Sequence, residues 1–138
     1  MSDVSIDYDD SQEAAKAVRD GLTAFNRHAA DLPEPLPVNV IVRDADGAIK
    51  GGVVGRFAID TVYIDLVWLD DSLKGKGVGR TMMGKAEDRA RALGATIAWL
   101  YTMSWQARPF YEHLDYKLLA EMPYANGRHR RYFMWKDL

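Results

Sequence analysis

The chain has 138 residues, no cysteine and a formal net charge of −2. That length suits one domain with one hydrophobic core, and the charge argues against a nucleic acid or an anionic membrane as partner. Without cysteine there is no disulfide framework, thiolate metal site or cysteine acyl-enzyme. No apolar run reaches the roughly 18 residues of a membrane span, and the start lacks the features of a signal peptide, so we expect a cytoplasmic protein.

The N-terminal part of the sequence predicts a strand, a helix and a stiff loop. Val4 to Tyr8 alternates apolar and polar residues, which is typical of a strand. Asp10 and Glu13 have the spacing of a capping box at the start of a helix. The helix would present one apolar face, made of Ala14, Ala15, Val18, Leu22, Phe25 and Ala29. The prolines between residues 31 and 37 then enforce an extended loop.

Residues 38–69 predict three consecutive antiparallel strands. The first is followed by Asp44-Ala45-Asp46-Gly47, a hairpin turn signal. The second strand, residues 49–58, contains several glycines, which indicate a bulge or a close approach of another backbone. The third, residues 62–69, is apolar on both faces except at Asp65, so we expect it to be central in the sheet.

The C-terminal half predicts a helix, a parallel strand, a short helix and two final strands. Apolar positions after Gly79 recur at helical spacing up to Gly94. Glu87 would lie on the opposite, exposed face, four residues before Arg91, which is the spacing of an ion pair. A strand at residues 96–102 would lie parallel to the one before the helix. A short helix at 110–114 and strands at 116–122 and 130–136 complete an α/β (α+β) fold. The sum is a mixed, mostly antiparallel sheet of six or seven strands with two main helices and a short one, in one domain covering residues 1–138.

A glycine-rich segment, Leu73-Lys74-Gly75-Lys76-Gly77-Val78-Gly79-Arg80, joins a predicted strand to a predicted helix. Such a turn presents backbone N–H groups and the positive end of a helix to an anion, and glycine tolerates the positive φ that it needs. We interpret it as a phosphate-binding loop; the alternative is a tight turn with no ligand. The Walker and dinucleotide patterns each miss a required residue here.

Two motifs in order resemble those of the GNAT superfamily of acetyl-CoA-dependent N-acetyltransferases. Residues 74–79 fit Arg/Gln-x-x-Gly-x-Gly/Ala, with lysine in the first position. Residues 104–116 fit a second landmark, Asn/Ser-x-x-Ala-x-x-φ-Tyr-Glu-x-φ-Gly-Phe/Tyr, where φ is apolar. The residues that match it are Ser104, Ala107, Phe110, Tyr111, Glu112, Leu114 and Tyr116. Asp115 replaces the usual glycine, so we expect a left-handed backbone there. The resemblance covers about residues 38–136.

The resemblance implies a GNAT-type acyltransferase with acetyl-CoA as co-substrate and no metal. The pantetheine arm of acetyl-CoA would enter a splay between two parallel strands. By resemblance, the cofactor-binding residues are Val67, Trp68 and Leu69 of the strand, Lys74, Gly75, Lys76, Gly77, Val78, Gly79 and Arg80 of the glycine loop, and Ser104 and Ala107.

Tyr111 matches the tyrosine that many members use as general acid toward the sulfur of coenzyme A; the alternative is a core aromatic residue. Asp65 is the candidate base or anchor for the amine, because a carboxylate in an apolar strand needs a partner or a role. By alternation it would point to the same side as Val67. Glu34, Asp60 and a water relay are alternative bases.

The acceptor we expect is a primary amine of a small molecule that attacks directly in a ternary complex. Alternatives are a protein or peptide amine, a non-catalytic CoA-binding sensor, or a nucleotide-binding regulator. A homodimer is common in the superfamily, which is analogy only. The basic segment 127–131 would be a solvated turn, or would contact the adenine 3′-phosphate or an acidic partner.

Overall fold

The computed structural model describes residues 3–138 and divides the chain into two compact units, one ending at Glu34 and one formed by Pro35–Leu138. The first unit contains the helix α1, Gln12–Ala30, which is not interrupted at Gly21. None of its residues is buried, because a single helix has nothing of its own to cover an apolar face.

Two predictions for the first unit are wrong. Residues 3–10 form no strand, and their side chains are exposed, so a period-two pattern without a neighbouring strand does not suffice. The helix is capped by Ser11, whose hydroxyl accepts a hydrogen bond from the Ala14 amide at 3.1 Å, and not by Asp10.

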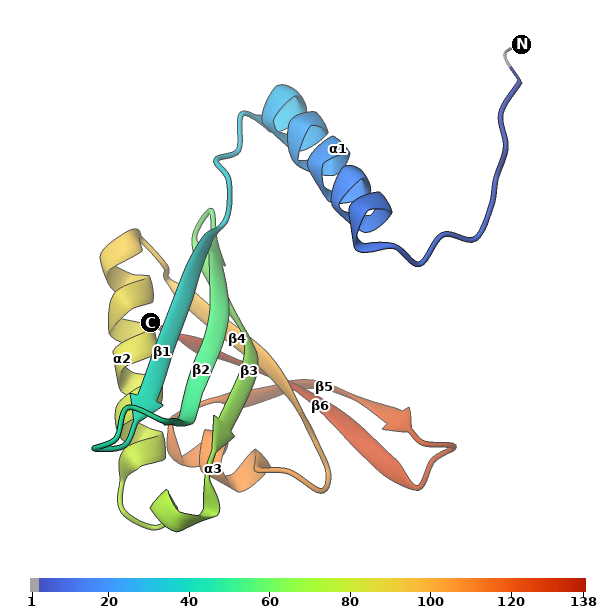
Figure 1. The fold of residues 1–138 in the computed structure, drawn as a ribbon. Helices are drawn as coiled ribbons and strands as arrows, with labels where there is room; N and C mark the ends of the chain where they lie inside the picture. The colour runs from blue at the N-terminus through green and yellow to red at the C-terminus, as the bar shows by residue number, and fades with distance from the viewer. Residues whose placement is uncertain (1–2) are drawn as a thin grey trace. The chain divides into compact units, whose positions relative to one another are not determined.

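The second unit is built on one six-stranded sheet (Figure 1). The strand order is β1-β2-β3-β4-β6-β5, and only β3 and β4 run parallel. The strands are β1 Leu36–Arg43, β2 Ile49–Ala58, β3 Thr61–Leu69, β4 Ile97–Met103, β5 Lys117–Tyr124 and β6 His129–Asp137. This confirms the predicted mixed sheet, with the apolar strand β3 in a central position.

The helices of this unit are α2, Val78–Leu93, the short α3, Arg108–His113, and a 3-10 turn at Asp71–Leu73. Figure 1 shows α2 along one face of the sheet, and the fully buried side chains lie beneath it. The largest of them are Ile64, Met83, Leu100, Met134, Val38, Val53 and Val62. The α2 crossover joins the two parallel strands, as the strand–helix–strand succession predicts.

The β2 glycines allow neighbouring backbones to approach closely. A Cβ on Gly51 would lie 2.7 Å from the Trp68 carbonyl oxygen, and one on Gly52 would lie 2.5 Å from that of Val40. The close approach that these glycines predict is therefore confirmed. The register with β3 shifts between Val54 and Gly55, but the extra residue there is Asp65, so the bulge lies in β3 and not in the glycine-containing strand.

Elements near the C-terminus differ slightly from their predicted bounds. Pro123, just beyond the predicted strand 116–122, lies in β5, an edge strand where a missing N–H is tolerated. Tyr116 precedes this strand and is buried. Asp115 has φ 72°, the left-handed conformation expected from its place in the second motif.

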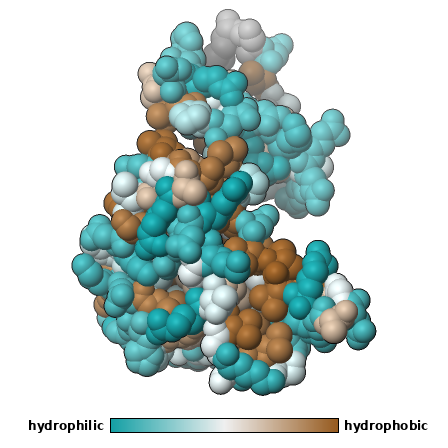
Figure 2. Space-filling model, turned by 90° about the vertical axis from the view of Figure 1, so that its left-hand side faces the viewer, coloured by the Kyte–Doolittle hydropathy of each residue, from teal (hydrophilic) through white to brown (hydrophobic). Residues whose placement is uncertain are grey.

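Large apolar side chains also remain exposed on the second unit, among them Leu66, Trp68, Tyr101 and Trp105. On the face that Figure 2 shows, apolar surface gathers in continuous areas within a mostly hydrophilic surround.

Candidate active site

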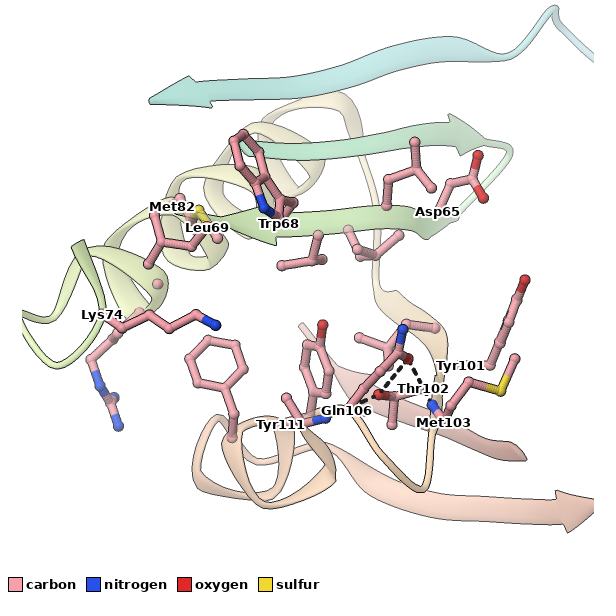
Figure 3. A pocket seen from close by; sticks show the side chains of 18 of the residues that line it. Asp65, Trp68, Leu69, Lys74, Met82, Tyr101, Thr102, Met103, Gln106 and Tyr111 are labelled. Atoms are coloured by element: carbon pink, nitrogen blue, oxygen red, sulfur yellow. Dashed lines mark hydrogen bonds between the residues drawn. The ribbon is translucent and has the colours of Figure 1, made fainter. Parts of the chain in front are cut away.

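The two parallel strands separate partway along their length, and the separation opens a cleft. Backbone pairing joins Thr61–Ile64 to Ile97–Leu100, whereas β3 continues to Leu69 and β4 to Met103. The resulting cleft has a volume of about 1050 Å³ and lies between the ends of these strands, the glycine loop and α3 (Figure 3). The predicted splay is therefore present.

The glycine loop closes one end of the cleft. Gly75 and Gly77 have φ of 77° and 79°, a region that other residues enter at a cost. Gly77 caps α2 without any side-chain hydrogen bond, and the first turn of α2 has no acidic residue. Its backbone N–H groups and the positive helix end are therefore suited to an anion.

The predicted loop residues fall into two groups. Those that line the cleft are Lys74, Gly75, Gly77, Gly79 and Arg80, whereas Lys76 and Val78 do not. Lys74 also forms an exposed ion pair with Asp71, at 2.7 Å. A Cβ on Gly79 would lie 3.2 Å from the Phe110 ring, which forms the facing wall, so a side chain there would have to displace that ring slightly.

Tyr111 extends from α3 into the middle of the cleft, with its hydroxyl directed toward β3 (Figure 3). The residue is only 7% exposed, and its ring packs edge-on against Phe110 and Tyr116. Burial raises the pKa of Tyr111 to about 12, so the phenol is protonated at neutral pH and can donate a proton.

Asp65 lines the cleft at the end opposite Lys74, where Tyr101 also lies (Figure 3). The prediction that it shares a side with Val67 is wrong. The register shift skips Asp65, so Val67 packs against the core whereas Asp65 is exposed. The carboxylate therefore keeps its hydration, and the argument from the cost of burying it does not apply. Its charge acts locally: burial, Tyr101 and Asp65 together raise the pKa of Tyr63.

A polar cluster that the sequence analysis missed holds the loop between β4 and α3. The Gln106 side-chain oxygen accepts hydrogen bonds from the Met103 amide at 2.8 Å and the Thr102 hydroxyl at 3.2 Å. The same hydroxyl accepts from the Ala107 amide, the first residue before α3. These bonds fix the start of the helix that carries Tyr111. A glutamine in a loop gives no sequence signal for such a role.

The remaining predicted residues occupy different places. Val67, Trp68, Leu69 and Ala107 line the cleft. Ser104 does not; its hydroxyl accepts from the Arg130 amide and lies 3.1 Å from His129 Nδ1, which ties the loop to β6. Asp60 sits in the β2–β3 turn, where it accepts a hydrogen bond from Thr61. Glu34 belongs to the first unit.

A second missed cluster lies in the core. Glu87, predicted on an exposed face of α2, is 5% exposed and accepts hydrogen bonds from the Tyr116 hydroxyl at 2.8 Å and Lys136 Nζ at 2.7 Å. Arg91, its predicted partner, pairs with Asp88 instead. Helical spacing placed Glu87 on the polar face, but β6 brings Lys136 against that side of the helix.

Within residues 3–138 no cluster of three His, Cys, Asp or Glu side chains could hold a metal ion. None of the helices in the same residues is long and apolar enough to cross a membrane.

The mixed sheet with its splayed parallel pair, the glycine-rich helix start and the buried tyrosine in the cleft are the features that the resemblance to acyltransferases implies. Comparison with known proteins gives the family. The sequence model of the acetyltransferase (GNAT) family matches residues 7–116, so the chain belongs to this family of enzymes.

Among its relatives, acetyltransferase Atu2258 of Agrobacterium fabrum is 30% identical over 117 residues, 84% of this chain and 85% of the relative. Blasticidin-S acetyltransferase of Streptomyces morookaense is 35% identical over 78 residues, 56% and 57% of the two chains.

Solved structures share the fold. A crystal structure from Agrobacterium tumefaciens is 26% identical, covers both chains fully and has a TM-score of 0.88. A Bacillus anthracis structure in complex with acetyl coenzyme A is 18% identical, with a TM-score of 0.66 over 76% of this chain and 64% of its own.

Proposed function

We propose that the protein transfers the acetyl group of acetyl-CoA to the primary amine of a small molecule, with residues 1–138 acting as one N-acetyltransferase domain. The observation that carries the proposal is the cleft, which has an anion-binding helix start at one end, a protonated tyrosine in the middle and an exposed carboxylate at the other end. The match to the family model runs through both units, which supports their acting together.

Acetyl-CoA would supply the acetyl group as a thioester, held along the cleft by this chain. The backbone N–H groups of residues 75–80 take the pyrophosphate, with Lys74 and Arg80 adding charge. The separated end of β3, residues 67–69, offers backbone groups that pair with no strand on the β4 side, and these can hydrogen-bond the pantetheine arm. The Ser104 hydroxyl already accepts a hydrogen bond from β6, so we propose that Ser104 holds the loop in place and does not bind the cofactor.

In the reaction the amine nitrogen forms a bond to the thioester carbon as the carbon–sulfur bond breaks. Tyr111 donates its phenolic proton to the leaving sulfur, a role that its raised pKa and central position permit. Asp65 attracts the ammonium form of the acceptor and passes its proton to water, since the exposed carboxylate is in contact with solvent. The second proton, which the nitrogen loses after attack, returns through water to the Tyr111 phenolate. The products are the N-acetyl amine, free coenzyme A and one proton released to water.

A small acceptor is supported by the relative named Blasticidin-S acetyltransferase, 35% identical over its matched part. The direct test is release of the coenzyme A thiol from acetyl-CoA in the presence of a panel of primary amines. The chain has no cysteine, so a thiol reagent reports only coenzyme A. We expect release that depends on the amine, with the acetylated amine seen by mass spectrometry. Binding of acetyl-CoA with no release for any amine would instead favour a CoA-binding sensor.

A further inference from the structure

Arg131 is a cation beside the candidate acceptor end of the cleft that the reaction above does not use. Its guanidinium carbon lies 4.9 Å from the ring centre of Tyr101 and 4.9 Å from that of Tyr124. Two aromatic rings therefore hold it from strands β4 and β5. Tyr101 is a wall residue of the cleft, at the end that Asp65 occupies (Figure 3).

The neighbouring residues connect Arg131 to the cleft more firmly. Arg131 is the cross-strand partner of Met103, and Tyr124 packs against Trp105 at 5.9 Å between ring centres. Met103 and Trp105 both line the cleft. Arg131 thus lies beside the wall formed by the end of β4, on the same face of the sheet as Met103 and just outside the lining of the cleft, far along it from the glycine loop.

Within residues 3–138, Arg131 has no acidic partner. The adjacent Arg130 pairs with Glu121 and the nearby Arg108 with Glu112, but no carboxylate lies within ion-pair distance of Arg131. Its Nε atom is buried and makes no hydrogen bond to any residue of that range. Arg56 also lies over a tyrosine ring, but Arg56 is exposed and therefore solvated.

A half-buried guanidinium without a counter-ion has lost hydration and regained only the attraction of the rings. The contacts with both rings also restrict its position, so the N–H donors of its terminal nitrogens are held ready for charge-assisted hydrogen bonds to an oxyanion. Because it lies at the Asp65 end, that oxyanion cannot be a phosphate of acetyl-CoA held at the glycine loop.

We infer that the acceptor is an amine that also carries an oxyanion, a carboxylate or a phosphate, and that Arg131 binds this group while Asp65 attracts the ammonium. This inference rests on the proposed function and names the substrate class of the same site.

The test uses matched acceptor pairs that differ in one charge. Amino acids are compared with their amides, and aminoalkyl phosphates with the corresponding amino alcohols. In one of these two series we expect kcat/KM of the wild type to be at least about tenfold higher for the anionic amine than for its neutral partner. A charge-assisted hydrogen bond would give a difference of this size. The series that shows the preference distinguishes a carboxylate from a phosphate.

Three variants complete the test. Arg131→Met should bring the ratio of kcat/KM between the anionic and the neutral amine to about one, because KM for the anionic amine rises. Arg131→Lys keeps the charge without the guanidinium fork and should retain only a few-fold preference. Arg130→Met is the matched control, one residue away and paired elsewhere, and should keep the wild-type ratio. If Arg131 is merely structural, Arg131→Met should lower the thermal stability and should lower kcat/KM for the anionic and the neutral amines alike. The ratio of the two kcat/KM values would then stay unchanged.

The inference is overturned if the wild type does not prefer the anionic amines in either series, or if Arg131→Lys and Arg131→Met keep the full wild-type preference. In both cases acetyl transfer itself stands. If no amine of any series releases coenzyme A, the proposed function falls and the inference with it.

Discussion

Tyr111 is the side chain on which the proposed chemistry depends most. Tyr111→Phe keeps the buried ring and removes the proton donor, so we expect kcat to fall by about 100-fold or more while the acetyl-CoA affinity changes by less than about twofold. Steady-state kinetics and calorimetry measure the two quantities. The control is Tyr132→Phe, a ring stacked under Arg108 that does not line the cleft, and it should leave kcat unchanged. An unchanged kcat in Tyr111→Phe would mean that Tyr111 serves packing alone and that solvent protonates the sulfur.

Glu87 is the residue with the largest predicted effect on stability. In Glu87→Ala the charge of Lys136 and the hydroxyl of Tyr116 lose their buried partner, which should lower the free energy of unfolding by about 3–5 kcal/mol. Asp88→Ala, at the next position, breaks only an exposed ion pair and should cost less than about 1 kcal/mol. Urea unfolding monitored by tryptophan fluorescence compares them. Equal effects would show that the buried network adds nothing beyond a surface pair.

At the scale of elements, the start of α2 must keep its left-handed glycines to present N–H groups. Gly77→Ala forces an alanine to φ near 79°, which costs about 1–2 kcal/mol or moves the loop, so acetyl-CoA should bind about tenfold more weakly. Gly84→Ala lies inside the same helix, and apart from the adjacent helix backbone no atom lies within 4 Å of the new Cβ. It should leave binding unchanged and raise stability by about 1 kcal/mol. Calorimetric titration of both variants with acetyl-CoA measures the two affinities. If Gly77→Ala binds acetyl-CoA as tightly as the wild type, the backbone N–H groups at the start of α2 do not hold the pyrophosphate.

The elements themselves were largely predictable, because helical and strand periodicity is local. The six strands, the parallel pair and the glycine loop follow from patterns and motifs within short segments. The side of the strand that Asp65 faces did not follow, because a bulge depends on the neighbouring strand. Glu87 was misplaced for a related reason: its partners Tyr116 and Lys136 come from the far end of the chain. The strand expected at residues 4–8 was wrong because alternation alone supplies no pairing partner.

For the molecule as a whole, the buried tyrosines predict a loss of stability in alkali. The pKa of Tyr111 is 10.0 when unfolded and about 12 when folded, and burial and Glu87 also raise the pKa of Tyr116. Because the folded values are raised, this contribution is fully present below pH 10.0 and is lost as pH rises toward about 12. For Tyr111 the loss approaches about 3 kcal/mol, at about 1.4 kcal/mol per unit.

Unfolding in urea at about pH 8 and about pH 11 measures this loss. Tyr111→Phe removes one of the two groups, so its stability should fall less steeply over the same range. If wild type and Tyr111→Phe lose stability equally, the Tyr111 phenol is already ionised or solvated in the folded protein.

The central claim, that the cleft between β3 and β4 binds acetyl-CoA, is tested most directly by calorimetric titration of the purified protein with acetyl-CoA, and in parallel with ATP and NAD. The account predicts micromolar binding of acetyl-CoA and no binding of the two nucleotides. Absence of acetyl-CoA binding, or ATP that binds and competes with it, would contradict the account and leave the glycine loop as a nucleotide site or a structural turn.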